Sequence, residues 1–134
     1  MPITFRIDKE SGIVYTTVEG RVSIDEIIEG LRACVSLPDF RPGLNGIADL
    51  RNSEFDPRPA DVERIAMLLT EYRNKIGLSK TAVVVSKAVT FGMTREFQAF
   101  AEHSSIDTEI FRDMDQARQW IGARDRNPGI AGGA

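Results

Sequence analysis

The segment KTAVVVS (residues 80–86) constrains the fold more than any other part of the chain. Its apolar residues do not alternate with polar ones, as they would in a strand with one face in water. A short continuous run of valines is typical of a strand that is buried on both faces, as in a parallel sheet. The segment therefore predicts an α/β protein in which helices pack on the sheet.

Four other segments have the composition of strands. The alternation in ITFRID and the β-branched residues in GIVYTTVEG predict an opening antiparallel hairpin, because a short turn separates them. GIADLR predicts a short, central third strand, and TEIFRD predicts the last one. These predicted strands are residues 3–8, 12–20, 46–51 and 108–113.

Helical spacing of apolar residues separates these strands. Ser23 opens the first helix, and Glu26 stands three residues later, which is the capping-box pattern. Pro38 ends that helix, Gly77 ends the second, and Asp113 caps a short final one. The predicted helices are residues 23–37, 59–76, 88–103 and a short one after Asp113, in which Met114, Ala117, Trp120 and Ile121 share a face.

The resulting order is ββαβαβαβα, which predicts a single α/β domain at residues 1–122. Each β-α-β unit implies a right-handed crossover between parallel neighbours, so the mixed, mostly parallel sheet has four to five strands with an antiparallel edge hairpin. After Gly122 the sequence ARDRNPGIAGGA predicts a flexible tail at residues 123–134.

Composition narrows the classes of function. The chain has 17 basic and 20 acidic residues, a net charge of -3, interleaved without a basic stripe, so we expect no nucleic-acid partner. No apolar run is long enough to span a membrane, and residues 1–10 lack the layout of a signal peptide, so we expect a cytoplasmic protein. Cys34 is expected in the core, and His103, the single histidine, makes no multi-histidine metal site.

The stretch IADLRNSEFDPRP (47–59) gathers the polar residues that are candidates for a site. A carboxylate near the carboxyl end of a parallel strand lies where open α/β sheets bind ligands. Asp49 fits that place, but it also fits a salt bridge with Arg51. The other members fit a turn and a helix start equally well. The candidate interaction loop consists of Asp49, Arg51, Asn52, Ser53, Asp56 and Arg58.

Motifs that carry catalysis or bind cofactors are missing from the sequence. There is no glycine-rich phosphate loop and no G-x-S-x-G elbow, so we expect no nucleotide cofactor and no serine-hydrolase chemistry. An enzyme that uses Asp49 with Arg51 or Ser53 stays a minor hypothesis, because no spacing in the chain requires it. No catalytic residue and no metal ligand is therefore assigned.

Three stretches resemble the SpoIIAA-like family of the STAS-like superfamily of small bacterial domains. They are the hairpin running into GRVSIDEI, the segment GIADLRNSEFDP, and the ending TEIFRDMDQARQWIG, and the likeness spans residues 3–122. The resemblance implies a mixed sheet with packed helices and no known catalysis. STAS domains proper have a phosphorylatable serine in an Asp-Ser-Ser-Gly run that opens a helix. Here that stretch reads Asp56, Pro57, Arg58, Pro59, Ala60, and Ser53 lies too early to match.

Two functions follow as expectations. The first is a non-enzymatic module that binds a protein partner, or a second copy of itself in a homodimer, through the loop after the third strand. The alternative is a carrier or sensor of a small apolar ligand, a lipid or acyl group, since the broader group is similar to lipid-binding CRAL-TRIO domains. The candidate pocket residues, which equally fit a plain core, are Phe91, Met93, Phe97, Phe100 and Trp120.

Overall fold

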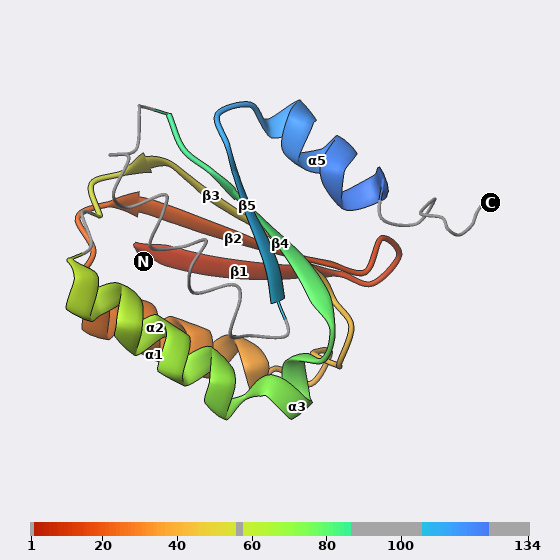
Figure 1. Cartoon of the computed structure of the whole chain (residues 1–134), viewed down its shortest axis with the longest axis horizontal. Helices are drawn as coiled ribbons and strands as arrows, with labels where there is room; N and C mark the ends of the chain where they lie inside the picture. The colour runs from red at the N-terminus through yellow and green to blue at the C-terminus, as the bar shows by residue number, and fades with distance from the viewer. Residues whose placement is uncertain (1, 56–57, 87–105, 124–134) are drawn as a thin grey trace.

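The computed structural model describes residues 2–55, 58–86 and 106–123 (Figure 1). Its centre is a five-stranded sheet in the order β1-β2-β3-β4-β5, in which only the β1–β2 pair is antiparallel. The mixed sheet with an antiparallel edge hairpin and a central third strand is therefore confirmed. The strands are β1 (Ile3–Asp8), β2 (Ile13–Gly20), β3 (Asn45–Ser53), β4 (Ser79–Val84) and β5 (Ile106–Phe111).

Helices cover both faces of this sheet, as the valine run predicts. In Figure 1, α1, α2 and α3 lie on one side of the sheet and α5 on the other. The helices α1 and α2 share one face because both belong to crossovers between parallel strands, which are right-handed. The described helices are α1 (Ile24–Val35), α2 (Pro59–Glu71), α3 (Arg73–Ile76) and α5 (Met114–Ala123).

The beginning of α1 follows the sequence prediction. The hydroxyl of Ser23 accepts a hydrogen bond from the backbone N–H of Glu26 at 3.1 Å, and the Glu26 carboxylate accepts one from the Ser23 N–H at 2.9 Å. This reciprocal pair satisfies two amide donors that an uncapped helix leaves unpaired. The predicted capping box is confirmed.

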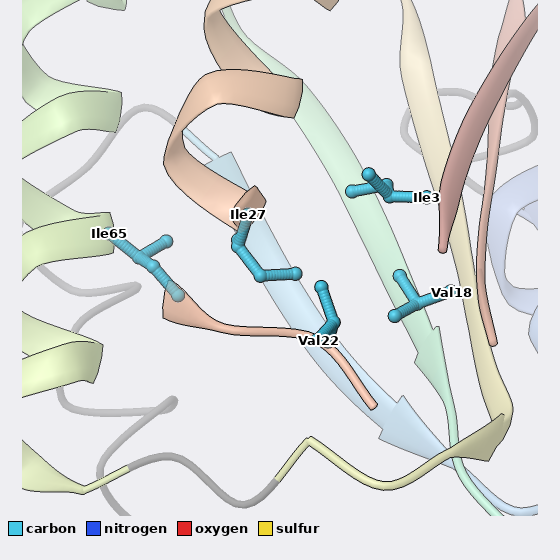
Figure 2. Packing of buried hydrophobic residues seen from close by; sticks show 5 residues of the cluster. All are labelled: Ile3, Val18, Val22, Ile27 and Ile65. Carbon is cyan, nitrogen blue, oxygen red and sulfur yellow. The ribbon is translucent and has the colours of Figure 1, made fainter. Parts of the chain in front are cut away.

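The main core lies between the sheet and the helices α1 and α2. Figure 2 shows five aliphatic side chains that converge there from two strands, two helices and the segment before α1. They are Ile3, Val18, Val22, Ile27 and Ile65. Two ion pairs join the helices above this core, Asp25 with Arg64 at 3.0 Å and Arg32 with Glu71 at 3.3 Å.

A second core lies between the sheet and α5. It is built around Ile47 of β3 and Val84 of β4, the largest fully buried side chains among the described residues. Alternate residues of β4 therefore point into different cores, and Ala82, Val83 and Val84 are all at most 7% exposed. This is why residues 82–85 form an unbroken apolar run, all of it buried.

Three boundaries differ from the prediction. The single helix expected at 59–76 is divided at Tyr72, whose backbone leaves helical values (φ −98°, ψ 15°). The last strand begins at Ile106 and ends at Phe111, two residues earlier at both ends than expected. The final helix runs to Ala123, the first residue of the predicted tail. The rest of the predicted tail and the predicted helix 88–103 lie outside the described residues.

The third strand is longer than the sequence indicated. β3 continues through Arg51, Asn52 and Ser53, which the sequence assigned wholly or partly to a loop. The register shifts by one residue between Thr17 and Glu19, and beyond this irregularity Asn52 pairs with Glu19 and Ser53 with Gly20. Pairing with a neighbouring strand thus overrides the turn propensity of this polar segment.

Candidate functional site

The candidate site lies at the carboxyl ends of β2 and β3, next to the N-termini of α1 and α2. The chain leaving β3 is held against the end of β2, because the Glu54 N–H donates to the Gly20 carbonyl at 2.8 Å. The Ser53 hydroxyl accepts a hydrogen bond from the Phe55 N–H at 2.9 Å. Ser53 therefore stabilises the start of the connection to α2.

Asp49 and Arg51 form a bidentate salt bridge. They are two residues apart in β3, so their side chains leave the same face of the sheet. Arg51 donates two guanidinium hydrogen bonds of 2.9 Å to the Asp49 carboxylate, and its backbone N–H adds a third at 3.1 Å. This arginine holds the pKa of Asp49 below its usual range, against a smaller opposing effect of burial. The salt-bridge interpretation of Asp49 is therefore confirmed. Its carboxylate is ionised, and both of its oxygens are bonded to Arg51.

The beginning of α2 depends on Asp61, which sequence reasoning missed. Its buried carboxylate accepts hydrogen bonds from the backbone N–H of Arg58 at 3.0 Å and from the Arg58 guanidinium at 3.4 Å. These bonds lower the pKa of Asp61, the backbone bond most. The sequence could have predicted this role, because Asp61 is an acid at the third position of a helix that begins with Pro59. Asp56, which the sequence predicts as a cap, lies outside the described residues.

We call the ion-paired surface at this end of the sheet the charged end. Arg21 and Glu54 are 3.8 Å apart there, and both side chains are largely exposed. Each acid in these pairs is bound to an arginine. No group of three His, Cys, Asp or Glu side chains within the described ranges is placed to hold a metal ion. The charged end consists of Arg21, Asp25, Asp49, Arg51, Glu54, Arg58, Asp61 and Arg64.

An apolar cavity of about 220 Å³ lies between the sheet and the helices α1 and α2. Its lining includes Leu31 of α1, Leu69 of α2 and Val83 of β4. Trp120 does not line it, because it belongs to α5 on the other face, where its ring lies 5.7 Å from that of Phe111. The expected grouping of Trp120 with this pocket is therefore wrong. The other predicted pocket residues lie outside the described residues: Phe91, Met93, Phe97 and Phe100.

Cys34 lies in the core on the inner face of α1, as predicted. Burial raises the pKa of its thiol to about 11, because a thiolate is poorly solvated among apolar side chains. The reactive thiolate form is therefore scarce at neutral pH. Cys34 packs as a small apolar residue and is not an activated nucleophile.

Solved structures with the same architecture are known. An anti-sigma factor antagonist from Mycobacterium paratuberculosis superposes with a TM-score of 0.57 and 16% identity, over 90% of this chain and 94% of that one. The chain has the SpoIIAA-like fold. A DUF3478-family protein from Shewanella loihica, described as having that fold, gives the same TM-score with 12% identity, over 89% and 91% of the two chains.

Comparison of the sequence alone finds no related family or protein. No family model and no curated protein matches the sequence. At 16% and 12% identity, the two structural neighbours establish the fold alone. In addition, none of the described helices is long and apolar enough to cross a membrane.

Proposed function

We propose that the protein is a non-enzymatic interaction module that binds a protein partner, or a second copy of itself, through the charged end. The observation that carries this proposal is the set of four acid–base pairs at two helix starts and a strand end, in which all four arginine side chains are exposed. Such a surface favours a partner of complementary charge pattern and disfavours others. It leaves no acid and nucleophile together for catalysis.

The fold supports the same function. One structural neighbour is an anti-sigma factor antagonist, a name that describes action on another protein. In this proposal the present chain acts likewise by association. It does so in the cytoplasm, since its single cysteine, Cys34, is a buried free thiol suited to a reducing compartment.

Phosphorylation of a serine at the start of α2 is not part of the proposed regulation. The helix opens with Arg58, Pro59 and Ala60, which offer no hydroxyl group. Ser53 lies at the end of β3, where its hydroxyl already serves the backbone of Phe55. Binding is therefore proposed to depend on the standing charges of the surface.

Site-specific photo-crosslinking in cells tests the proposed surface. A photoreactive residue is placed at Asn52 or at Arg58, and at Glu10 in the β1–β2 turn as a control at the opposite end of the sheet. We expect the first two positions to capture one and the same protein, or this chain itself, and Glu10 to capture neither. Equal capture from Glu10, or different products at Asn52 and Arg58, would contradict the proposal.

A binding measurement with the purified partner provides the second readout. The Arg58 side chain is 79% exposed, whereas its ion-pair partner Asp61 is buried. We expect Arg58→Ser to weaken association about tenfold, as loss of a contact at an interface centre does. Arg41→Ser, which removes the same charge from the loop before β3, is the control and should leave affinity unchanged.

A small apolar ligand is the second candidate, favoured by the cavity under α1 and α2. Its volume of about 220 Å³ is below the roughly 300–1,000 Å³ of most ligand sites. Native mass spectrometry of the freshly purified chain tests the candidate. A small-molecule mass lost on denaturation would support it, and a bare chain mass would remove it.

A further inference from the structure

A hollow of about 390 Å³ lies on the face of the sheet that carries α5. It is bounded by β1 on one side and by α5 on the other, with β2 and β3 beneath. The helix packs chiefly on β4 and also on β3 and β5, and β1 at the edge of the sheet lies beyond it. The hollow is distinct from the apolar cavity, which lies on the opposite face.

The dimensions of sheet and helix explain why the hollow exists. Strands are about 4.8 Å apart and a helix with its side chains is about 10 Å across, so a helix centred on β4 does not reach β1, the third strand away from it. On this face β1 presents the polar residues Thr4 and Arg6, whereas β2 presents Ile13 and Tyr15 as well as Thr17. Along each strand these residues alternate with residues that face the main core, the pattern typical of a sheet face that is at least partly exposed to water.

The charge in the hollow is opposite in sign to that of the whole chain. Three arginines and one aspartate line it, whereas the chain carries a net charge of -3. Asp49 neutralises Arg51 through the bidentate pair described above. Arg6 from β1 and Arg118 from α5 make no ion pair with any acid in the described part of the chain. Two positive charges therefore remain uncompensated on opposite walls.

Two features suit this hollow to an organic anion. The guanidinium of Arg6 lies over the Tyr15 ring at 4.4 Å from its centroid, so a cation–π contact already restricts Arg6 and lowers the entropy lost on binding. Met114, four residues before Arg118 on α5, and the buried Ile47 add an apolar wall and floor. Charge-assisted hydrogen bonds from guanidinium groups are strongest with carboxylate and phosphate oxygens.

We propose that this hollow is a binding site for a small organic anion. Its carboxylate or phosphate group is held between Arg6 and Arg118, and its apolar part lies against Met114. The hollow shares the Asp49–Arg51 pair with the charged end, but Arg6 and Arg118 lie outside the charged end, and Asn52 and Arg58, which test the partner surface, do not line the hollow. One can fail while the other holds.

An NMR titration of the ¹⁵N-labelled full chain tests the site with phenyl phosphate and benzoate as probes. Benzyl alcohol supplies a ring without charge, and inorganic phosphate supplies charge without a ring. We expect amide shifts at Thr4, Tyr15 and Thr17 with both aromatic anions, weaker ones with inorganic phosphate, and none with benzyl alcohol. Tighter binding of phenyl phosphate or of benzoate assigns the natural ligand to phosphates or to carboxylates.

Three single variants decide whether the two arginines act as proposed. Arg6→Gln and Arg118→Gln should each weaken the tighter probe about tenfold, the loss expected for one charge-assisted contact. Arg41→Gln removes an equal charge elsewhere and should leave affinity unchanged. All three side chains belong to exposed residues, so unchanged circular dichroism spectra are expected. Equal weakening in all three variants, or no amide shift with either aromatic anion, would overturn the proposal.

Discussion

Truncation of Ile47 to alanine tests the second core, on which the position of α5 and hence the wall of the hollow depend. Ile47 is 1% exposed and packs with Ala82, Val84 and Ala117. The change removes three carbon atoms from a site enclosed by β-sheet backbone, which leaves little room for collapse. The expected loss is about 3 kcal/mol, within the roughly 2–5 kcal/mol seen for buried Ile→Ala changes.

That loss corresponds to a measurable change in melting temperature. For 134 residues, an unfolding entropy of about 2.1 cal/mol/K per residue converts 3 kcal/mol into a decrease of about 11 °C. Thermal and urea unfolding followed by circular dichroism give both values. Met67→Ala on α2 is the control, because its side chain is 67% exposed and should change stability by less than about 0.5 kcal/mol. Similar decreases for both variants would refute the assignment of Ile47 to a tightly packed core.

Three further predictions concern single residues. Gly77→Ala should destabilise by about 1–3 kcal/mol, because Gly77 has φ 72° and ψ −168°, a glycine-only region, and an added Cβ would lie 3.1 Å from its neighbours; Gly122→Ala, where nothing lies within 4 Å, should be neutral or stabilising in urea unfolding. Because the folded-state pKa of Asp49 is lowered, the stability it contributes is present above its unfolded pKa of about 3.9 and is lost as pH falls through the folded value. Urea midpoints at pH 7 and pH 3 should therefore differ less in Asp49→Asn than in the wild type, and parallel losses would contradict the salt bridge. Iodoacetamide should alkylate Cys34 in the native protein at pH 8 far more slowly than in urea, because burial raises the pKa of the thiol to about 11, and equal rates would show that it is accessible.

Local patterns predicted those parts of the fold in which nearby residues decide the structure. The capping box at Ser23 joins groups three residues apart, and the salt bridge of Asp49 joins neighbours on one face of a strand. Both interactions could be predicted because the interacting groups are close in the sequence. The break in the helix at Tyr72 could not be predicted, because the apolar spacing continues across this residue. The Tyr72 hydroxyl accepts a hydrogen bond from Arg32, which lies on a different helix.

The candidate site was predicted in part for the same reason. The loop after the third strand was identified from its polar crowding, but Asn52 and Ser53 proved to be strand residues paired with β2. Asp61 was overlooked because its role depends on burial at the start of α2. Trp120 was assigned to the wrong face, because hydrophobicity shows that a side chain is buried but not which layer it enters.

By itself the sequence determined the alternation of strands and helices, the valine-rich buried strand and the antiparallel hairpin, since each follows from the period of its own apolar residues. Only the tertiary structure decided what lies together across the sheet. It brought Arg6 of β1 to the hollow that Arg118 of α5 also lines, and it put Trp120 opposite the cavity under α1 and α2. The physical reason is that a helix about 10 Å across is narrower than a five-stranded sheet, so the side chains left uncovered depend on where the last helix packs.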